Sequence, residues 1–143
     1  MIKITFMGAG STVFLRNVLG DCIYTDALKG MEIALYDIDG QLLEAINKGN
    51  GCPASIRSYL GAENRRKALS GADFVINAIQ VGGYDPCTIT DFEIPKKYGL
   101  RQTIGDTLGI GGIMRALRTI PVLEDFARDM EAVCPNAWFL NYT

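Results

Sequence analysis

The chain has 143 residues, of which 48% are hydrophobic and 21% are charged, with 14 basic side chains against 16 acidic ones. This composition is typical of one globular domain, and a net charge of −2 gives no electrostatic reason to expect nucleic acid or a membrane as partner. The chain contains no histidine, which excludes within it every catalytic or metal site that needs an imidazole.

The four cysteines are scattered and form no CxxC pair: Cys22, Cys52, Cys87 and Cys134. We expect reduced thiols in a cytoplasmic protein, and two disulfides in a secreted domain are the alternative. The segment Met1–Met7 favours the first reading, because it lacks the basic and apolar regions of a secretory signal. No apolar run approaches the ~18 residues that a membrane span requires.

Short apolar runs alternate with helical patterns along the chain. In chain order the patterns predict strand 2–7, helix 11–19, strand 32–36, helix 39–49, strand 54–59, helix 63–70, strand 73–80, helix 88–98, helix 112–133 and strand 137–142. Pro121 lies inside the last helical pattern and predicts that this helix is kinked or split. The alternation indicates an α/β fold: a doubly wound, Rossmann-like parallel sheet in one domain over residues 1–143, with strand order 3-2-1-4-5.

A glycine-rich segment follows the first strand directly and opens the first helix: Gly8-Ala9-Gly10-Ser11-Thr12-Val13. Gly8 would allow a tight turn, Gly10 would let a pyrophosphate approach, and the amides of Ser11 and Thr12 would point at the phosphates. Because Val13 replaces the third glycine of the usual fingerprint, a strand-to-helix turn without a ligand is the alternative. Asp37, after the second strand, favours a dinucleotide, because its carboxylate could accept both ribose hydroxyls and would repel a 2′-phosphate. NAD is therefore favoured over NADP.

Four further segments contain residues that could contact a ligand. Gln80 opens a glycine turn after the fourth strand and would lie beside the nucleotide, although a plain turn explains it equally well. Asp106 lies in a loop with four glycines in eight residues, and its alternative role is to cap the following helix. Arg115 and Arg118 could bind anions or simply form a solvated helix face. Asn141, after the last strand, would project toward the nicotinamide side of the crevice, or be a buried amide that is satisfied internally.

These motifs occur in the order seen in one enzyme family. The chain resembles the N-terminal domain of glycoside hydrolase family 4, of the α-galactosidase (melibiase) type, in its segments Gly8–Phe14, Tyr36–Asp39, Val81–Tyr84, Thr107–Gly112, Arg115–Pro121 and Leu140–Tyr142. The pair Asp106-Thr107 looks like the α-galactosidase branch rather than the 6-phospho-glycosidase branch.

The resemblance implies an NAD- and Mn²⁺-dependent hydrolase of carbohydrate metabolism that acts on an α-galactoside and, as a whole enzyme, forms a homo-oligomer. In this family NAD oxidises the C3 hydroxyl of the sugar, a base removes the C2 proton, the glycosidic oxygen is eliminated, water adds, and NADH restores the hydroxyl. Mn²⁺ stabilises the negative charge that develops on the sugar.

Family roles pass to the matching positions only. The resemblance implies NAD contacts at Gly8, Gly10, Ser11, Thr12 and Asp37, a catalytic role for Asp106, and substrate binding by Asn141. Gln80 is a further candidate for cofactor binding, from its place after the fourth strand. The resemblance implies no metal ligand here, because the cysteine and histidine ligands of the family lie further along than Thr143. We therefore expect a truncated chain that lacks the substrate and metal domain and is inactive alone.

Two other interpretations stay open at this point. An NAD-dependent 2-hydroxy-acid dehydrogenase domain would share the glycine segment and Asp37, and a nonenzymatic nucleotide-binding module would need no further domain. The stretch 43–59 is shorter than its counterpart in the family, which leaves open whether the third strand is kept.

Overall fold

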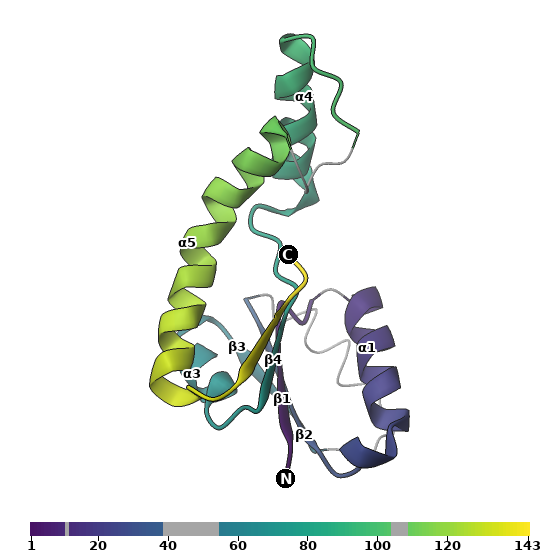
Figure 1. Ribbon diagram of the computed structural model, residues 1–143, viewed down its shortest axis with the longest axis vertical. Coiled ribbons are helices and arrows are strands. Elements are labelled where there is room, and N and C mark those ends of the chain that lie inside the picture. The colour runs from purple at the N-terminus through teal and green to yellow at the C-terminus, as the bar shows by residue number, and fades with distance from the viewer. Residues whose placement is uncertain (11, 39–54, 104–108) are drawn as a thin grey trace. The chain divides into compact units, whose positions relative to one another are not determined.

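The computed structural model describes residues 1–10, 12–38, 55–103 and 109–143 (Figure 1). The helix predicted over 39–49 lies outside these residues. The chain divides into two compact units, Met1–Ile79 with Arg128–Thr143, and Gln80–Ala127, and each is described by itself. Within the described ranges, no helix is both long enough and apolar enough to cross a membrane.

The first unit is built on a parallel sheet. Its strands are β1 (Lys3–Met7), β2 (Glu32–Asp37), β3 (Ser55–Leu60), β4 (Phe74–Asn77) and β5 (Trp138–Asn141). Among the described residues the sheet has five strands in the order β3-β2-β1-β4-β5, and every adjacent pair is parallel. This confirms the predicted Rossmann-like order and shows that the third strand is kept. Strand β4 ends at Asn77, earlier than predicted, and the chain enters the second unit at Gln80.

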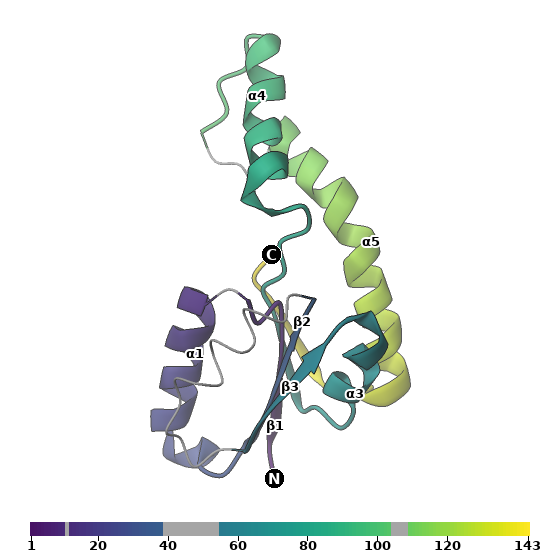
Figure 2. The same ribbon diagram turned by 180° about the vertical axis from the view of Figure 1, so that it is seen from behind.

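Helices cover both faces of this sheet (Figures 1 and 2). Helix α1 (Thr12–Tyr24) packs on one face, and the short turn η1 (Asp26–Leu28) leads from it into β2. The turn η2 (Ala62–Asn64) and helix α3 (Arg65–Leu69) lie on the opposite face. Helix α1 continues five residues past its predicted end at Leu19, because Gly20 fits within it without interrupting it.

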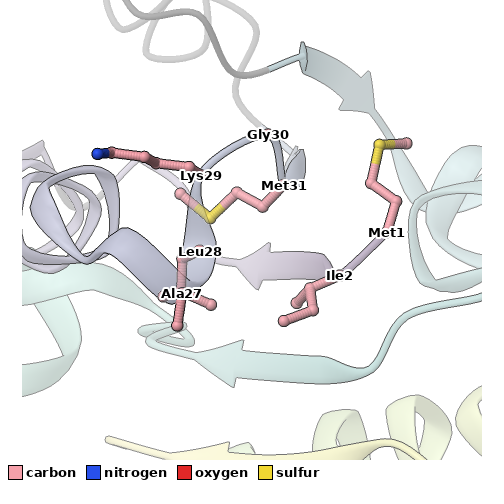
Figure 3. A pocket seen from close by; sticks show the side chains of 7 residues that line it. All are labelled: Met1, Ile2, Ala27, Leu28, Lys29, Gly30 and Met31. Carbon is pink, nitrogen blue, oxygen red and sulfur yellow. The ribbon is translucent and has the colours of Figure 1, made fainter.

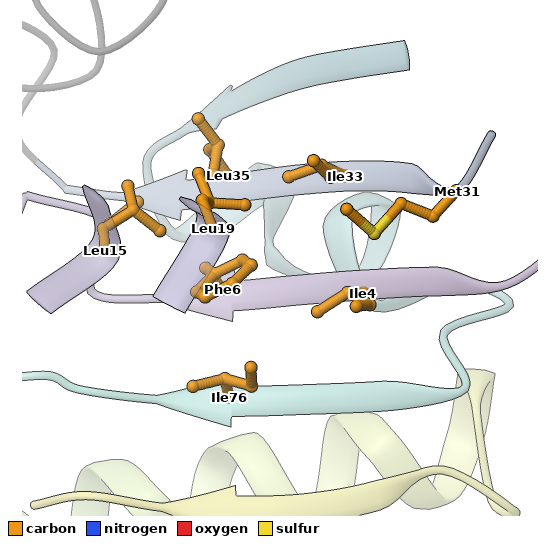
Figure 4. Packing of buried hydrophobic residues seen from close by; sticks show 9 residues of the cluster. Ile4, Phe6, Leu15, Leu19, Met31, Ile33, Leu35 and Ile76 are labelled. Carbon is orange, nitrogen blue, oxygen red and sulfur yellow. The ribbon is translucent and has the colours of Figure 1, made fainter. Parts of the chain in front are cut away.

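The core lies between α1 and the sheet (Figure 4). Alternate residues of a strand share one face, so Ile4 and Phe6 of β1 and Ile33 and Leu35 of β2 point toward the helix. The buried cluster consists of Ile4, Phe6, Ala9, Leu15, Leu19, Met31, Ile33, Leu35 and Ile76. Because this cluster anchors both β1 and the first turns of α1, the loop between them is held at each end.

The opposite face is held by polar contacts as well as apolar ones. The Thr5 hydroxyl donates to the carbonyl oxygen of Ala68 in α3 at 2.9 Å. Asp129, near the end of α5 (Ile110–Val133), accepts hydrogen bonds from Arg65 Nε at 2.5 Å and Arg66 Nε at 2.7 Å. Burial alone would raise the pKa of Asp129, but the two arginines outweigh it, so the pKa lies below its usual range. One carboxylate thus ties α3 to the last turns of α5.

The second unit contains the turn η3 (Gly83–Thr88), α4 (Ile89–Lys97) and α5 as far as Ala127. Pro121 lies within α5, which runs as one helix from Ile110 to Val133, so of the predicted kink or split the split does not occur. A proline removes the hydrogen bond to the carbonyl four residues earlier, which here belongs to Leu117. Because Leu117 is 71% exposed, water can satisfy that carbonyl at little cost.

Candidate functional site

The glycine turn after β1 lies at the carboxyl ends of the strands. The amides of Gly8 and Ala9 both donate to the carbonyl oxygen of Tyr36 in β2, each at 3.0 Å. Gly8 has φ +80°, and a Cβ at this position would lie 2.8 Å from the carbonyl carbon and oxygen of Ala78. Only glycine fits here, because the turn passes against the backbone that continues β4.

Asp37, the last residue of β2, meets this turn. Its Oδ2 accepts a hydrogen bond from the Gly10 amide at 2.5 Å, across 27 positions of sequence. The sheet therefore brings the predicted acidic residue to the predicted glycine segment, where α1 begins at Thr12. A narrow turn that excludes any Cβ, a helix N-terminus and a carboxylate at the end of β2 are the parts that a dinucleotide requires. The described residues thus fit NAD.

Asn141 ends β5 at the same edge of the sheet. Its Oδ1 accepts a hydrogen bond from Asn77 Nδ2 at 2.7 Å, and the two residues are register partners in β4 and β5. Asn77 is completely buried, whereas Asn141 is exposed. Asn77 was not predicted as a site residue from the sequence. The signal that could have identified it is a polar amide directly after the apolar segment Phe74–Ile76.

The ends of β2 and β5 mark the two sides of this edge. Neighbouring strands lie about 4.8 Å apart, so the three spacings from Asp37 to Asn141 amount to about 14 Å. Dinucleotides bind across such an edge, with their two halves over different parts of the sheet. The arrangement separates a carboxylate on one side from an amide on the other.

Further contacts hold the residues that follow β4 and β5. The Thr143 hydroxyl donates to the carbonyl oxygen of Ile79 at 2.6 Å, and the rings of Tyr142 and Phe14 lie 4.9 Å apart between centroids. The residues after β5 therefore pack on those after β4 and on α1.

Gln80 and the glycine turn that follows belong to the second unit. Gln80 Nε2 donates to Thr88 Oγ1 at 3.1 Å. Gly82 has φ +83°, and a Cβ there would lie 2.3 Å from the sulfur of Cys87, which explains the glycine without a ligand. Arg118 Nε donates to the carbonyl oxygen of Val81 at 3.1 Å, so this turn has a fixed internal partner.

Arg118 also forms a bidentate ion pair with Asp91 of α4. Nη1 lies 2.9 Å from Oδ1, Nη2 lies 2.5 Å from Oδ2, and Asp91 is 2% exposed. The hydrogen bonds that Arg118 donates to Asp91 raise the pKa of Arg118 above its ordinary value. Arg118 therefore binds a carboxylate, which was one of the alternatives, but this carboxylate belongs to the chain itself.

Two predicted site residues, Ser11 and Asp106, lie outside the described residues, and Thr12 is described only as the first residue of α1. In the described ranges, no three or more His, Cys, Asp or Glu side chains gather to hold a metal ion. The described residues therefore do not fit Mn²⁺.

A pocket of about 230 Å³ lies at the other end of the sheet (Figure 3). It is lined by Met1, Ile2 and the segment 27–31, which precede β1 and β2. Because the glycine turn follows β1, this pocket is not part of the candidate site.

Comparison with known proteins identifies the family of this chain. The family model described as family 4 glycosyl hydrolase matches residues 3–143. The chain belongs to glycosyl hydrolase family 4. This confirms the resemblance that the motifs indicated.

Family 4 members with different substrates match this chain. It is 61% identical over 150 residues to an α-galactosidase of Bacillus subtilis, covering 100% of this chain and 34% of that protein. It is 37% identical over 142 residues to an α-galacturonidase of Thermoanaerobacter italicus, covering 99% of this chain and 31% of that protein. The chain thus spans about a third of the length of the curated relatives it matches.

A solved family 4 structure has the same fold. The 6-phospho-β-glucosidase of Thermotoga maritima, solved with manganese, NAD⁺ and glucose 6-phosphate, superposes with a TM-score of 0.86 at 24% identity. The match covers 100% of this chain and 34% of that one. The Rossmann-like fold is therefore shared well beyond the range of close sequence similarity.

Proposed function

We propose that this chain is the NAD-binding part of an NAD- and Mn²⁺-dependent α-galactosidase. The observation that carries the proposal is the contact between the Gly10 amide and the Asp37 carboxylate, beside a turn in which Gly8 alone fits. Family membership adds the reaction class, and 61% identity to an α-galactosidase favours that substrate. Residues 1–143 would be the nucleotide-binding domain, and a substrate and metal domain would follow it.

Each residue has a proposed task toward the cofactor. Asp37 accepts the ribose hydroxyls and repels a 2′-phosphate, while Gly8 and Gly10 let the pyrophosphate approach the backbone. The amides of Ser11 and Thr12 donate to the phosphates at the start of α1, and Gln80 lies beside the nucleotide.

The substrate side uses other residues. NAD, when bound, accepts a hydride from C3 of the sugar. Asn141 holds the substrate beside the nicotinamide, and Asp106 acts as an acid or base, or contacts a sugar hydroxyl. The Mn²⁺ ligands would come from the chain beyond Thr143, and the whole enzyme would be a homo-oligomer.

Calorimetry tests the nucleotide half of the proposal on this chain alone. We expect NAD to bind and NADP to bind more weakly. A chain that folds but binds neither nucleotide would contradict the proposal and leave a nonenzymatic interaction domain.

The proposed activity on the substrate must be tested on a full-length enzyme, as long as the curated relatives. We expect release of nitrophenol from a nitrophenyl α-galactoside with NAD, Mn²⁺ and a reductant present, and no turnover by residues 1–143 alone. The matched substrate is the α-galacturonide, because an α-galacturonidase is 37% identical. Faster hydrolysis of the α-galacturonide than of the α-galactoside would contradict the proposed substrate and indicate an α-galacturonidase.

A further inference from the structure

We propose that Asn77 is a positioning residue that fixes the side-chain amide of Asn141, so that Asn141 Nδ2 is presented to the nicotinamide half of the cofactor as a donor. This inference rests on the proposed function, because it deepens the role of Asn141 in the same site. Asn77 itself is fully buried, so it would act on the cofactor only through Asn141.

The hydrogen bonds of Asn141 determine which end of its amide is available. Its Oδ1 accepts from Asn77 Nδ2 at 2.7 Å and lies 3.4 Å from the Thr143 amide, whereas its Nδ2 has a long contact of 3.4 Å to the carbonyl oxygen of Thr143. The acceptor oxygen is therefore engaged, and the Nδ2 group can still donate. An exposed Asn141 without Asn77 could present either end, because rotation about its terminal torsion exchanges oxygen and nitrogen.

The backbone beneath the pair leaves little other freedom. Asn77 and Asn141 are register partners, and the Tyr142 amide donates to the carbonyl oxygen of Asn77 at 2.9 Å. The main chain is thus held on both sides of Asn141, so only the side-chain torsions of Asn141 are free to change. The hydrogen bond from Asn77 fixes these torsions.

Stability does not explain why an amide occupies position 77. Asn77 is fully buried, and its Oδ1 has no hydrogen-bond partner among the described residues. A buried acceptor without a partner is unfavourable, and an apolar side chain of the same size would avoid this cost. What leucine could not supply is the donor to Asn141, so we assign that as the function of the residue.

The orientation suits an acceptor on the ligand. The nicotinamide half of NAD carries a carboxamide oxygen, and ADP-ribose contains the rest of the molecule without that group. ADP-ribose lacks the whole nicotinamide, so the ratio of the two affinities reports all contacts to that group, and the change in the ratio between variants isolates the contribution of Asn141.

The test is Asn77→Leu, with affinities for NAD and ADP-ribose measured by calorimetry and unfolding measured by heat. We expect NAD to bind about tenfold more weakly, as for the loss of one well-oriented hydrogen bond. ADP-ribose affinity should be unchanged, and the unfolding midpoint should be equal or higher. Asn141→Ala should give the same loss, and the double variant should lose no more, because the two residues act as one unit.

Thr5→Val is the matched control. It removes another buried hydrogen bond on the same face of the sheet, from Thr5 to Ala68, away from the carboxyl edge. We expect a lower midpoint and an unchanged ratio of NAD to ADP-ribose affinity.

Asn77→Asp provides a rescue that a merely structural role would not show. A protonated carboxyl can donate to Asn141 Oδ1 and an ionised one cannot, and burial raises the pKa of such a group. The affinity ratio of this variant should approach that of the wild type at acid pH and fall as the pH rises, while the Leu variant stays flat.

Three results would overturn the inference. One is an unchanged ratio in Asn77→Leu while Asn141→Ala lowers it, and another is an equal loss of NAD and ADP-ribose affinity together with a lower midpoint. The third is an unchanged ratio in Asn141→Ala, which would show that this amide makes no nicotinamide contact.

A readout without ligand separates this inference from the proposed function. The side-chain amide resonances of Asn141 should show one fixed orientation in the wild type and averaging in Asn77→Leu. If the wild type bound no NAD, the proposed function would fail, and averaging already present in the wild type would show that Asn77 does not fix Asn141.

Discussion

At Gly8 two separate demands fall on one residue. The backbone has φ +80°, which L side chains rarely adopt, and a Cβ would approach the Ala78 carbonyl to 2.8 Å. The first demand alone could be met at modest cost, but the second involves backbone that cannot move without shifting the end of β4. Gly8 is thus fixed by the sheet beneath it as much as by any ligand.

We expect Gly8→Ala to lose at least 1 kcal/mol of unfolding free energy from the dihedral alone, with NAD binding abolished. Denaturant unfolding and calorimetry measure the two effects. Gly20→Ala is the control, since a Cβ at Gly20, within α1, would meet no heavy atom within 4 Å among the described residues. That variant should gain about 0.5–1 kcal/mol, and a destabilised Gly20→Ala would show that α1 tolerates no added methyl.

The charge of Asp37 should decide between NAD and NADP. Asp37→Asn keeps an acceptor for the Gly10 amide and removes the repulsion of a 2′-phosphate. We expect the preference for NAD over NADP to narrow by about tenfold or more, since repulsion between like charges is worth about 1–4 kcal/mol. Competition calorimetry gives both affinities. Glu32→Gln, at the other end of β2, removes one charge as well and should leave the preference intact.

Residues that belong to a known fingerprint were predictable here, even where the sheet brings them together across 27 positions, and pairs outside that fingerprint were not. Gly8 and Asp37 carry a known fingerprint, so each could be named before the strands were placed. Asn77 and Asn141 lie 64 positions apart, and their contact depends on the register of β4 with β5, which local propensity does not determine. The same applies to Arg118, whose partner Asp91 lies on another helix.

At the scale of elements, the alternation of strands and helices was enough to predict the sheet order, because right-handed crossovers leave few topologies. Helix α5 continues through Pro121 for a local reason: the rule that proline breaks a helix assumes that leaving the carbonyl without its hydrogen bond is costly. On an exposed side of α5 that cost is small, so the helix continues.

The contact between α3 and α5 depends on Asp129. Asp129→Ala leaves two arginines without their carboxylate, one of them with a side chain only 18% exposed, so we expect a loss of about 3 kcal/mol of unfolding free energy. Asp26→Ala removes an exposed pair with Lys29, 88% and 71% exposed, and should cost less than about 1 kcal/mol. Equal losses in the two variants would contradict the assigned role.

The pH dependence of this contact follows from the lowered pKa of Asp129. Its stabilisation is complete above the unfolded pKa of about 4 and is lost as the pH falls through the lower folded value. Unfolding measured at a series of acid pH values should therefore show the wild type and Asp129→Ala converging.

For the whole molecule, the described nucleotide-site residues Gly8, Asp37 and Asn141 all belong to the first unit, whereas Gln80 belongs to the second. NAD should therefore stabilise residues 1–143 without any further domain, by about 2.7 kcal/mol at a free concentration of 100 times Kd. Thermal unfolding with increasing NAD measures this, and Gly8→Ala should show no shift. A midpoint that did not respond to NAD in the wild type would contradict the proposed function.

The order β3-β2-β1-β4-β5 has a consequence for synthesis on the ribosome. Strand β1 leaves the ribosome first but occupies the centre of the sheet, so one of its edges has no neighbour until β4 has emerged. Seventy residues separate Met7 from its register partner Asn77, which corresponds to about 4–14 s of translation at ~5–20 residues per second. During that time an apolar strand presents unpaired amides and carbonyls to other chains. A nascent chain of this protein is therefore most prone to misassociate before β4 emerges, and a synonymous slow codon placed just ahead of residue 74 would prolong that interval.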